Sequence, residues 1–205
     1  SSALIPACSV SFTSTNDYAV RMAPYSSPTF TSCTYGAPRF PAVAIEGGYT
    51  GTARWAPTGV GYAVLGTVDV YNGSTLSIAP GDTLRFAPGT QLRANYNGSG
   101  GIISAIGTAD SVIVFTSLNG ANGGWGGISL SYSASTFDRC IIEKVGGSEG
   151  ALYSYGSSLV TLRHCTLNNT AARCLYLGNP AIVDSCTFTG SPAATVECSH
   201  NSITM

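Results

Sequence analysis

The sequence predicts an all-β fold, a right-handed parallel β-helix in which each turn of about 22 residues contains three strands. The first observation is a repeat: apolar residues return in three columns at spacings of 21 to 25 residues. The columns are Cys140, Cys165 and Cys186; Leu152, Leu175 and Val196; and Val160, Ile182 and Ile203. Because one such turn cannot bury its apolar face alone, successive turns must stack.

The second observation is the composition of the segments that would form the strands of each turn. From about Tyr62 onward, short runs rich in Val, Ile, Leu, Thr, Phe and Tyr alternate with Gly, Asn, Pro or Ser, as in Thr75–Ile78 and Ile102–Ile106. Such runs are typical of short strands, and none has a helical period. The general preference for right-handed crossovers between parallel strands gives the expected handedness.

The first part of the chain differs from the rest. Residues 1–60 contain six of the ten prolines, so we expect an irregular N-terminal extension or cap before a β-helix at 61–205. Cys8 and Cys33 flank a stretch rich in Ser, Thr, Tyr and Pro, and a disulfide between them would add about 3 kcal/mol of stability. That disulfide predicts an extracellular location, and a start at Ser1 fits a secreted chain whose signal peptide has been removed.

The composition argues against several classes of partner. Charged residues make up 9% of the chain and the net charge is −1. Nucleic-acid binding requires a clustered basic surface, which this chain lacks. No apolar run reaches the ~18 residues of a membrane span. Seven cysteines occur without a C-x-x-C pair, so neither a metal site nor another cofactor is expected.

A family resemblance covers residues from about 60 to 145 and, through the repeat, more than half of the chain. Residues 76–86 read L-S-I-A-P-G-D-T-L-R-F, similar to the turn motif L-T-I-x-P-G-T-x-(I/L)-x-F of secreted bacterial β-helix proteins. The segments that match in order are Tyr62–Val70, Leu76–Phe86, Ile103–Asp110, Ile113–Ser117, Trp125–Ile128 and Phe137–Glu143. Together they resemble the repeat of the pectin-lyase-like superfamily.

This resemblance implies the fold rather than an activity. Members of the superfamily include polysaccharide lyases and hydrolases, and also adhesins, phage fibres and surface proteins. Lyase signatures with paired aspartates and clustered arginines are missing, and the ten acidic residues are spread along the chain. We therefore identify no catalytic residue.

Two sets of residues are candidates for contact with a glycan or another subunit. Asp138, Arg163 and Asp184 each lie two residues before a cysteine of the repeat, so stacking would align them along one corner. A solvent-exposed ladder of alternating charges is the simpler interpretation, and a sugar-binding site is the alternative. Tyr153 and Tyr176 follow Leu152 and Leu175, so their rings should stack outward, as ordinary packing or as a contact surface.

The remaining chemical groups have structural interpretations. Cys140, Cys165 and Cys186 are expected to form a buried core column of small apolar side chains. His164 shares a corner with Ser185 and Asp184, but chance proximity in a serine-rich coil explains this better than a catalytic triad.

Three N-glycosylation sequons begin at Asn72, Asn97 and Asn168, each at a predicted turn.

The repeat continues to Met205 with no charged or helical cap. Open strand edges normally require a cover, so we expect head-to-tail self-association. The predicted function is a secreted, non-enzymatic structural protein of an extracellular filament or cell-surface assembly. The alternatives are a glycan-binding or polysaccharide-degrading β-helix, and a phage-type fibre or adhesin.

Overall fold

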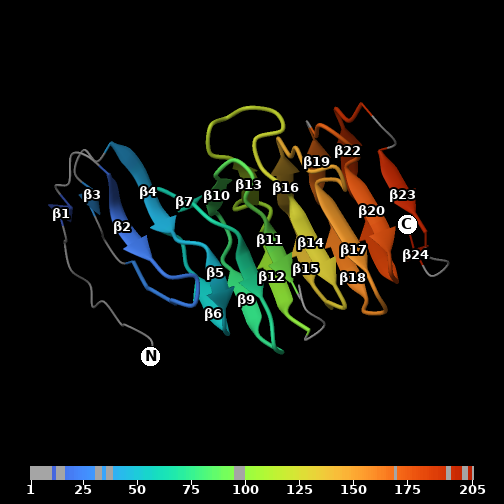
Figure 1. Ribbon diagram of the computed structural model, residues 1–205, viewed down its shortest axis with the longest axis horizontal. Coiled ribbons are helices and arrows are strands. Elements are labelled where there is room, and N and C mark those ends of the chain that lie inside the picture. Colours follow the sequence, from blue (N-terminus) through green and yellow to red (C-terminus); the bar gives the residue numbers. More distant parts are fainter. Residues whose placement is uncertain are drawn as a thin grey trace.

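The computed structural model describes residues 11–12, 17–30, 34–35, 39–94, 100–168, 170–192, 195–199 and 203–204. These residues contain strands and no helix, and three parallel sheets stack into a β-solenoid of about seven turns (Figure 1). The predicted all-β parallel solenoid with three strands per turn is confirmed. Cys8, Cys33 and Asn97 lie outside the described residues. In the described part of the chain, no helix long and apolar enough to cross a membrane is found.

Each sheet takes one strand from every turn. Sheet I consists of β2 (Tyr18–Met22), β4 (Phe40–Ile45), β7 (Tyr62–Val64), β10 (Thr83–Phe86), β13 (Ile113–Ser117), β16 (Cys140–Glu143), β19 (Thr166–Asn168) and β22 (Thr187–Thr189). Sheet II consists of β5 (Gly48–Thr50), β8 (Val68–Val70), β11 (Leu92–Ala94), β14 (Ile128–Ser131), β17 (Leu152–Tyr155), β20 (Leu175–Gly178) and β23 (Val196–Cys198). Sheet III consists of β6 (Ala53–Trp55), β9 (Thr75–Ile78), β12 (Ile102–Ile106), β15 (Thr136–Asp138), β18 (Val160–Arg163), β21 (Ala181–Asp184) and β24 (Ile203–Thr204). A separate pair joins β1 (Ser11–Phe12) to β3 (Thr34–Tyr35).

Strands that precede residue 61 also belong to the parallel sheets. β4, β5 and β6 form a complete turn, and β2 adds one more strand to sheet I. The register of this turn continues that of the next, because Ala44 pairs with Ala63 and Tyr49 pairs with Asp69. The chain between about residues 40 and 60 therefore already has the geometry of the solenoid.

The strand register can be compared directly with two of the predicted columns, the one that contains Leu152 and the one that contains Val160. Leu152, Leu175 and Val196 pair in register, as predicted.

The predicted column of Val160, Ile182 and Ile203 is wrong at Ile182, which is displaced by one residue. Val160 and Ile203 both pair with Ala181, whereas Ile182 pairs with Thr204. Because successive side chains of a strand point to opposite faces, this shift places buried Ala181 inside and half-buried Ile182 outside.

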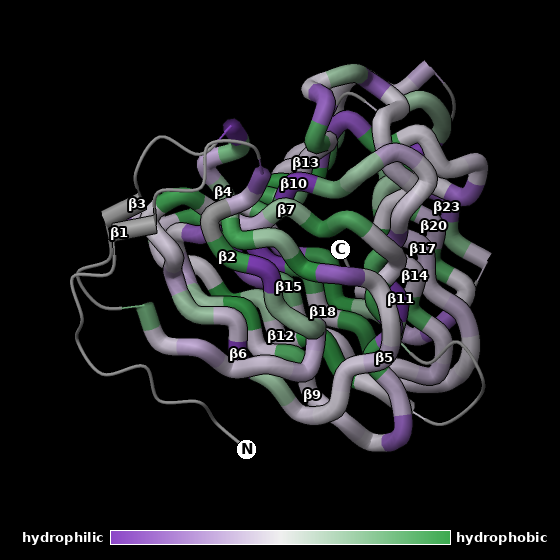
Figure 2. The backbone as a smooth tube through the Cα atoms, turned by 60° about the vertical axis from the view of Figure 1, so that its left-hand side comes forward, coloured by the Kyte–Doolittle hydropathy of each residue, from purple (hydrophilic) through white to green (hydrophobic). Residues whose placement is uncertain are grey.

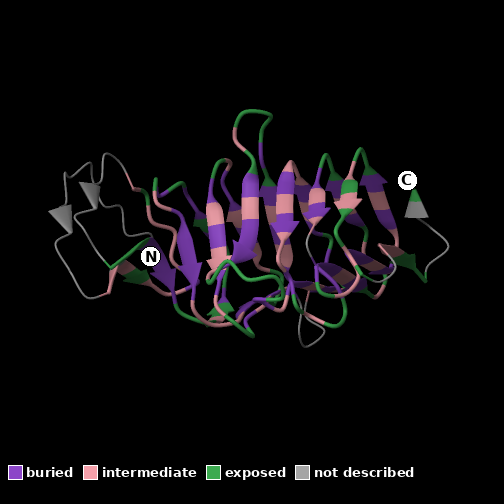
Figure 3. Cartoon of the chain, turned by 90° about the horizontal axis from the view of Figure 1, so that it is seen from above, coloured by how far each residue is buried: buried purple, intermediate pink, exposed green. Residues whose placement is uncertain are grey.

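The core is a continuous apolar stack along the solenoid axis. Buried and half-buried residues alternate along most strands (Figure 3), as expected when one face of each sheet packs inward. Aromatic rings fill the middle turns: the rings of Phe86 and Trp125 stack at 4.2 Å, and Phe115 lies 6.2 Å from Phe137. Figure 2 shows how successive turns follow one another around this shared interior.

A sharp corner between sheet III and sheet I explains the spacing of the cysteine repeat. Arg139, His164 and Ser185 each connect a strand of sheet III to sheet I, with φ angles of 50°, 50° and 53°. These are left-handed backbone conformations, which are uncommon for residues other than glycine. One such residue turns the chain, so the next residue is already the inward-facing cysteine.

Candidate binding surfaces

The outer face of sheet II carries one unbroken column of polar and aromatic side chains. Adjacent members are paired across neighbouring strands, from β5 to β23. The column consists of Tyr49, Asp69, Arg93, Ser129, Tyr153, Tyr176 and Glu197. A straight column of this kind follows directly from parallel strands stacked in register.

Three tyrosines gather on the outer face of sheet II near its C-terminal end. Tyr153 and Tyr176 belong to the column and Tyr155 lies beside it; we call these three residues the tyrosine face. Tyr153 and Tyr176 pair in register on β17 and β20. Tyr155 lies 5.9 Å from the Tyr153 ring and 5.3 Å from the Tyr176 ring, measured between centroids. The guanidinium of Arg173 lies 5.3 Å from the Tyr176 centroid, a cation–π contact. The result is a partly exposed aromatic surface with a cationic edge.

The carboxylates beside the tyrosines already have partners. Tyr155 donates a hydrogen bond to Glu149 at 2.7 Å, and Arg173 pairs with Glu197 at 2.9 Å. Burial, followed by the hydrogen bond to Glu149, raises the pKa of Tyr155, so its phenol stays protonated. The face therefore offers aromatic rings, one ion pair and one carboxylate that accepts a hydrogen bond from a phenol.

Further along sheet II, Arg93 holds Asp69 with two hydrogen bonds of 2.6 and 2.8 Å. This bidentate geometry joins β8 to β11 across neighbouring turns.

The charged corner residues stack in register on sheet III. Asp138 pairs with Arg163 on the next strand, and Arg163 pairs with Asp184 on the one after. Their side chains do not form a simple ladder, because the Asp138 carboxylate instead contacts Arg139 at 3.2 Å and His164 at 2.9 Å.

The groups of a hypothetical Ser–His–Asp arrangement are separated. His164 bonds to Asp138, whereas the Ser185 hydroxyl donates to its neighbour Asp184 at 2.9 Å. No hydrogen bond joins His164 to Ser185 among the described residues, so the structure gives no support for a nucleophile at this corner.

The cysteines of the repeat lie at the start of sheet I. Cys140 and Cys165 are buried and Cys186 is partly buried; all three are free thiols, as are buried Cys174 and exposed Cys198. A hydrogen bond with Cys140 raises the pKa of Cys165 to about 12. Such thiols are protonated at neutral pH and are poor nucleophiles.

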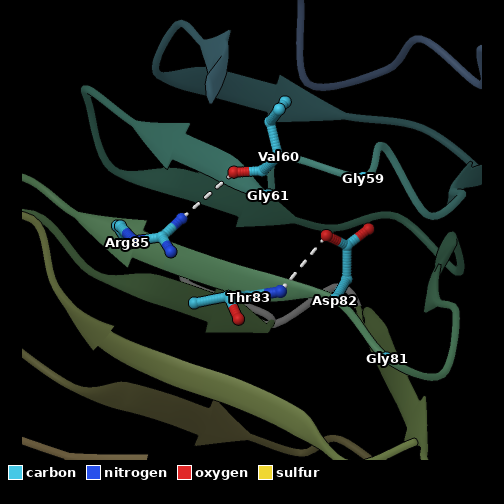
Figure 4. A pocket seen from close by; sticks show the side chains of 7 residues that line it. All are labelled: Gly59, Val60, Gly61, Gly81, Asp82, Thr83 and Arg85. Carbon is cyan, nitrogen blue, oxygen red and sulfur yellow. Dashed lines mark hydrogen bonds between the residues drawn. The ribbon is translucent and has the colours of Figure 1, made fainter. Parts of the chain in front are cut away.

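Asp82 is a buried acidic residue that the sequence reasoning missed. It lies in a cleft of about 190 Å³ lined by Gly59, Val60, Gly61, Gly81, Asp82, Thr83 and Arg85 (Figure 4). One signal was available: Asp82 stands where the resembling turn motif has threonine.

The Asp82 carboxylate is only half satisfied. The residue is 3% exposed, and its Oδ1 accepts a hydrogen bond from the backbone N–H of Thr83 at 3.1 Å. Its Oδ2 is buried and has no hydrogen-bond partner among the described residues. Burial raises the pKa of Asp82 to about 7, against the opposing effects of the Thr83 and Thr58 backbone and of Arg85. Arg85 donates to the carbonyl of Val60 at 3.3 Å (Figure 4).

An apolar hollow of about 210 Å³ adjoins this cleft, and Arg85 lines both. Its other lining residues are Tyr18, Phe40, Pro41, Ala42 and Leu118. The rings of Tyr18 and Phe40 stack at 5.0 Å, and Phe40 is 40% exposed.

The glycosylation candidates differ in position. Asn72 is exposed in the turn after β8, with a φ of 58°. Asn168 is half-buried at the end of β19.

Within the described ranges, no group of three or more His, Cys, Asp or Glu side chains is arranged to hold a metal ion.

The geometry defines the class of this protein as a parallel β-solenoid with an aromatic outer face and a separate cleft that contains Asp82 and Arg85. Comparisons with family models, with curated proteins and with solved structures find no match for the chain.

Proposed function

We propose that this protein is a secreted, non-enzymatic β-helix of the pectin-lyase-like type that binds an extended polysaccharide along sheet II. The observation that carries the proposal is the tyrosine face, where the ring of Tyr155 contacts the rings of both Tyr153 and Tyr176. Aromatic faces can pack against the C–H faces of sugar rings, and the phenol hydroxyls can bond to sugar hydroxyls.

The periodicity of the face suits a linear polymer. Neighbouring strands of a sheet lie about 4.8 Å apart, which is close to the length of one pyranose unit. A polysaccharide that runs along the solenoid axis would therefore meet Tyr153 on one turn and Tyr176 on the next. Arg173 and Glu197 lie at the same end and supply polar groups for its hydroxyls.

The same residues favour binding over cleavage. A glycosidase needs two carboxyl groups that are available to act as acid and as base or nucleophile. Beside the tyrosine face, Glu149 accepts from Tyr155 and Glu197 pairs with Arg173. Neither carboxylate is poised for proton transfer to a glycosidic oxygen.

Affinity electrophoresis in gels that contain soluble neutral and acidic polysaccharides tests this proposal. We expect retardation by at least one polysaccharide, and Tyr176→Ala should weaken it by about tenfold, equivalent to 1.4 kcal/mol. Tyr25→Ala is the matched control, because Tyr25 is 65% exposed and follows Pro24, which bonds to Thr50 of β5, four strands from β17 in sheet II. Retardation by no polysaccharide, or equal effects of the two variants, contradicts the proposal.

End-to-end assembly is a second candidate, and the last described turn favours it. β22, β23 and β24 each pair on one side only within the described residues. Their inward residues Phe188 and Val196 pack against the core but stay partly exposed. A second copy of the chain could supply the next strands of all three sheets.

Light scattering and electron microscopy of the 205-residue protein test this assembly. Concentration-dependent filaments that are lost in Phe188→Glu, while Thr136→Glu on an outer face of sheet III keeps them, would support it. A protein that stays monomeric at high concentration rules it out.

A further inference from the structure

Asp82 occupies a core position of the solenoid. Its neighbour Thr83 pairs with Val114, so Asp82 is level with Ile113. Ile113 in turn pairs with Cys140. The inward column at the start of sheet I therefore contains a carboxyl group where later turns contain isoleucine and cysteine.

Stability does not account for a carboxyl group at this position. Burying a carboxylate without full hydrogen bonding is unfavourable by several kcal/mol, and Oδ2 of Asp82 has no partner among the described residues. The Thr83 backbone N–H bonds to Oδ1, and the Thr58 backbone also lowers the pKa of the carboxyl group but makes no hydrogen bond to Oδ2. An apolar side chain at this position would match its neighbours in the column and avoid the penalty.

The charges in the cleft restrict what could satisfy Asp82. A ligand must exchange a hydrogen bond with Oδ2, which accepts when Asp82 is ionised and donates when it is protonated. Arg85 on the same wall has further N–H donors besides the one that it gives to Val60. A sugar hydroxyl is both donor and acceptor. A free cation would meet the Arg85 guanidinium, and above about pH 7 an anion would meet the ionised Asp82 carboxylate. The presence of Asp82 and Arg85 in one cleft therefore favours a neutral ligand that is rich in hydroxyl groups.

The adjoining hollow supplies the apolar half of such a site. Tyr18 and Phe40 present stacked rings there, and Arg85 connects the hollow to the cleft. A pyranose unit has the same division, with hydroxyls around its edge and C–H groups on its faces. The volumes of about 190 and 210 Å³ suit one or two such units.

We propose that the Asp82 cleft and the adjoining hollow form a saccharide-binding site that takes a neutral end unit, with vicinal hydroxyls bridging Asp82 and Arg85. This site lies on sheet I and uses none of the tyrosines of sheet II, so it is independent of the proposed polysaccharide face. The two sites can be tested separately.

Saturation-transfer difference NMR of the intact protein with neutral methyl hexopyranosides is the test, with methyl glucuronide and glucosamine as charged comparisons. We expect transfer to at least one neutral glycoside, and about tenfold weaker binding in Asp82→Asn and in Asp82→Val, because a hydrogen bond to the carboxyl group is lost. Asp184→Asn is the control, since Asp184 is exposed on sheet III, and it should bind normally.

The stability of Asp82→Val completes the test. If Asp82 is retained for a ligand, this variant should unfold at the same or a higher urea concentration than the unmodified protein. A marked loss of stability would show that Asp82 holds the turn, and would overturn the proposal. Binding of no neutral glycoside, binding unaffected by Asp82→Asn, or a preference for either charged sugar would also overturn it. The tyrosine face is tested separately by Tyr176→Ala, which should leave binding at Asp82 unchanged.

Discussion

Asp138 and His164 meet across neighbouring turns, with 2.9 Å between Oδ1 of the carboxylate and Nδ1 of the ring. They are 26 residues apart in the chain, and the contact exists because the corners between sheet III and sheet I stack. Both side chains are partly exposed, so the bond contributes less than about 1 kcal/mol. The backbone of His164 matters more than its ring.

The first prediction concerns that backbone. His164 has a φ of 50°, a conformation that disfavours any side chain with a Cβ. We expect His164→Gly to be more stable than His164→Ala by about 1 kcal/mol, because both lose the Asp138 contact and glycine alone relieves the strain. Urea unfolding measures the difference. At Arg163, a strand residue one position earlier, the alanine variant should be more stable than the glycine variant. If glycine were the more stable residue at both positions, relief of backbone strain at His164 would not be the cause.

A second prediction concerns the ion pair on sheet II. Asp69 is buried, and Arg93 holds it in a bidentate bond. Arg93→Met should lower the free energy of unfolding by about 3 kcal/mol, because it leaves a buried carboxylate without its charged partner. The double variant Asp69→Leu/Arg93→Met removes that charge and should recover most of the loss. An equal loss in both variants would mean that the pair acts only through packing.

A third prediction orders the reactivity of the described thiols. Cys198 is exposed, whereas Cys140, Cys165 and Cys174 are buried. Timed alkylation at neutral pH with peptide mass spectrometry should modify Cys198 first and leave Cys165 until the protein unfolds, since its pKa of about 12 keeps the thiol protonated. In denaturant all should react alike. Early modification of Cys165 in the folded protein would contradict the buried column.

A fourth prediction follows from the titration of Asp82. Its pKa is raised to about 7 in the fold, so the folded protein keeps a proton that the unfolded chain releases near pH 4. The contribution of Asp82 to the free energy of unfolding should therefore be lost as the pH rises from about 4 to about 7. Urea unfolding across this range should show that loss relative to Asp82→Asn. Parallel pH profiles of the two proteins would show that Asp82 titrates normally.

The stacking of turns could be predicted because inward residues repeat with a constant phase. Leu152, Leu175 and Val196 pair as expected, and that register also placed Tyr153 beside Tyr176. The same reasoning failed at Ile182, because hydrophobicity alone does not determine which of two adjacent apolar residues points inward. The smaller Ala181 is buried there, and the larger isoleucine faces outward.

The burial of Asp82 could not be predicted from the spacing of the repeat for a different reason. The corner between β12 and β13 spans residues 107–112, whereas Arg139 alone forms the next one. Corners of different length change the distance along the chain between stacked residues, so the spacing does not align Asp82 with Cys140. The contact of Tyr155 with both other tyrosines was likewise not predicted, because it depends on side-chain conformation.

The aromatic stack of the middle turns gives the solenoid an uneven resistance to unfolding. Phe86, Phe115, Trp125 and Phe137 bury large rings there, whereas the buried residues of the later turns are chiefly leucine, valine, cysteine and alanine. Because each turn of a solenoid is held chiefly by its immediate neighbours, local opening should begin in the turns after Cys165 and spread inward. Amide hydrogen exchange should then proceed as a gradient along the axis, with the slowest amides around Phe115. A ligand bound on the tyrosine face would slow exchange most where the unliganded solenoid opens first.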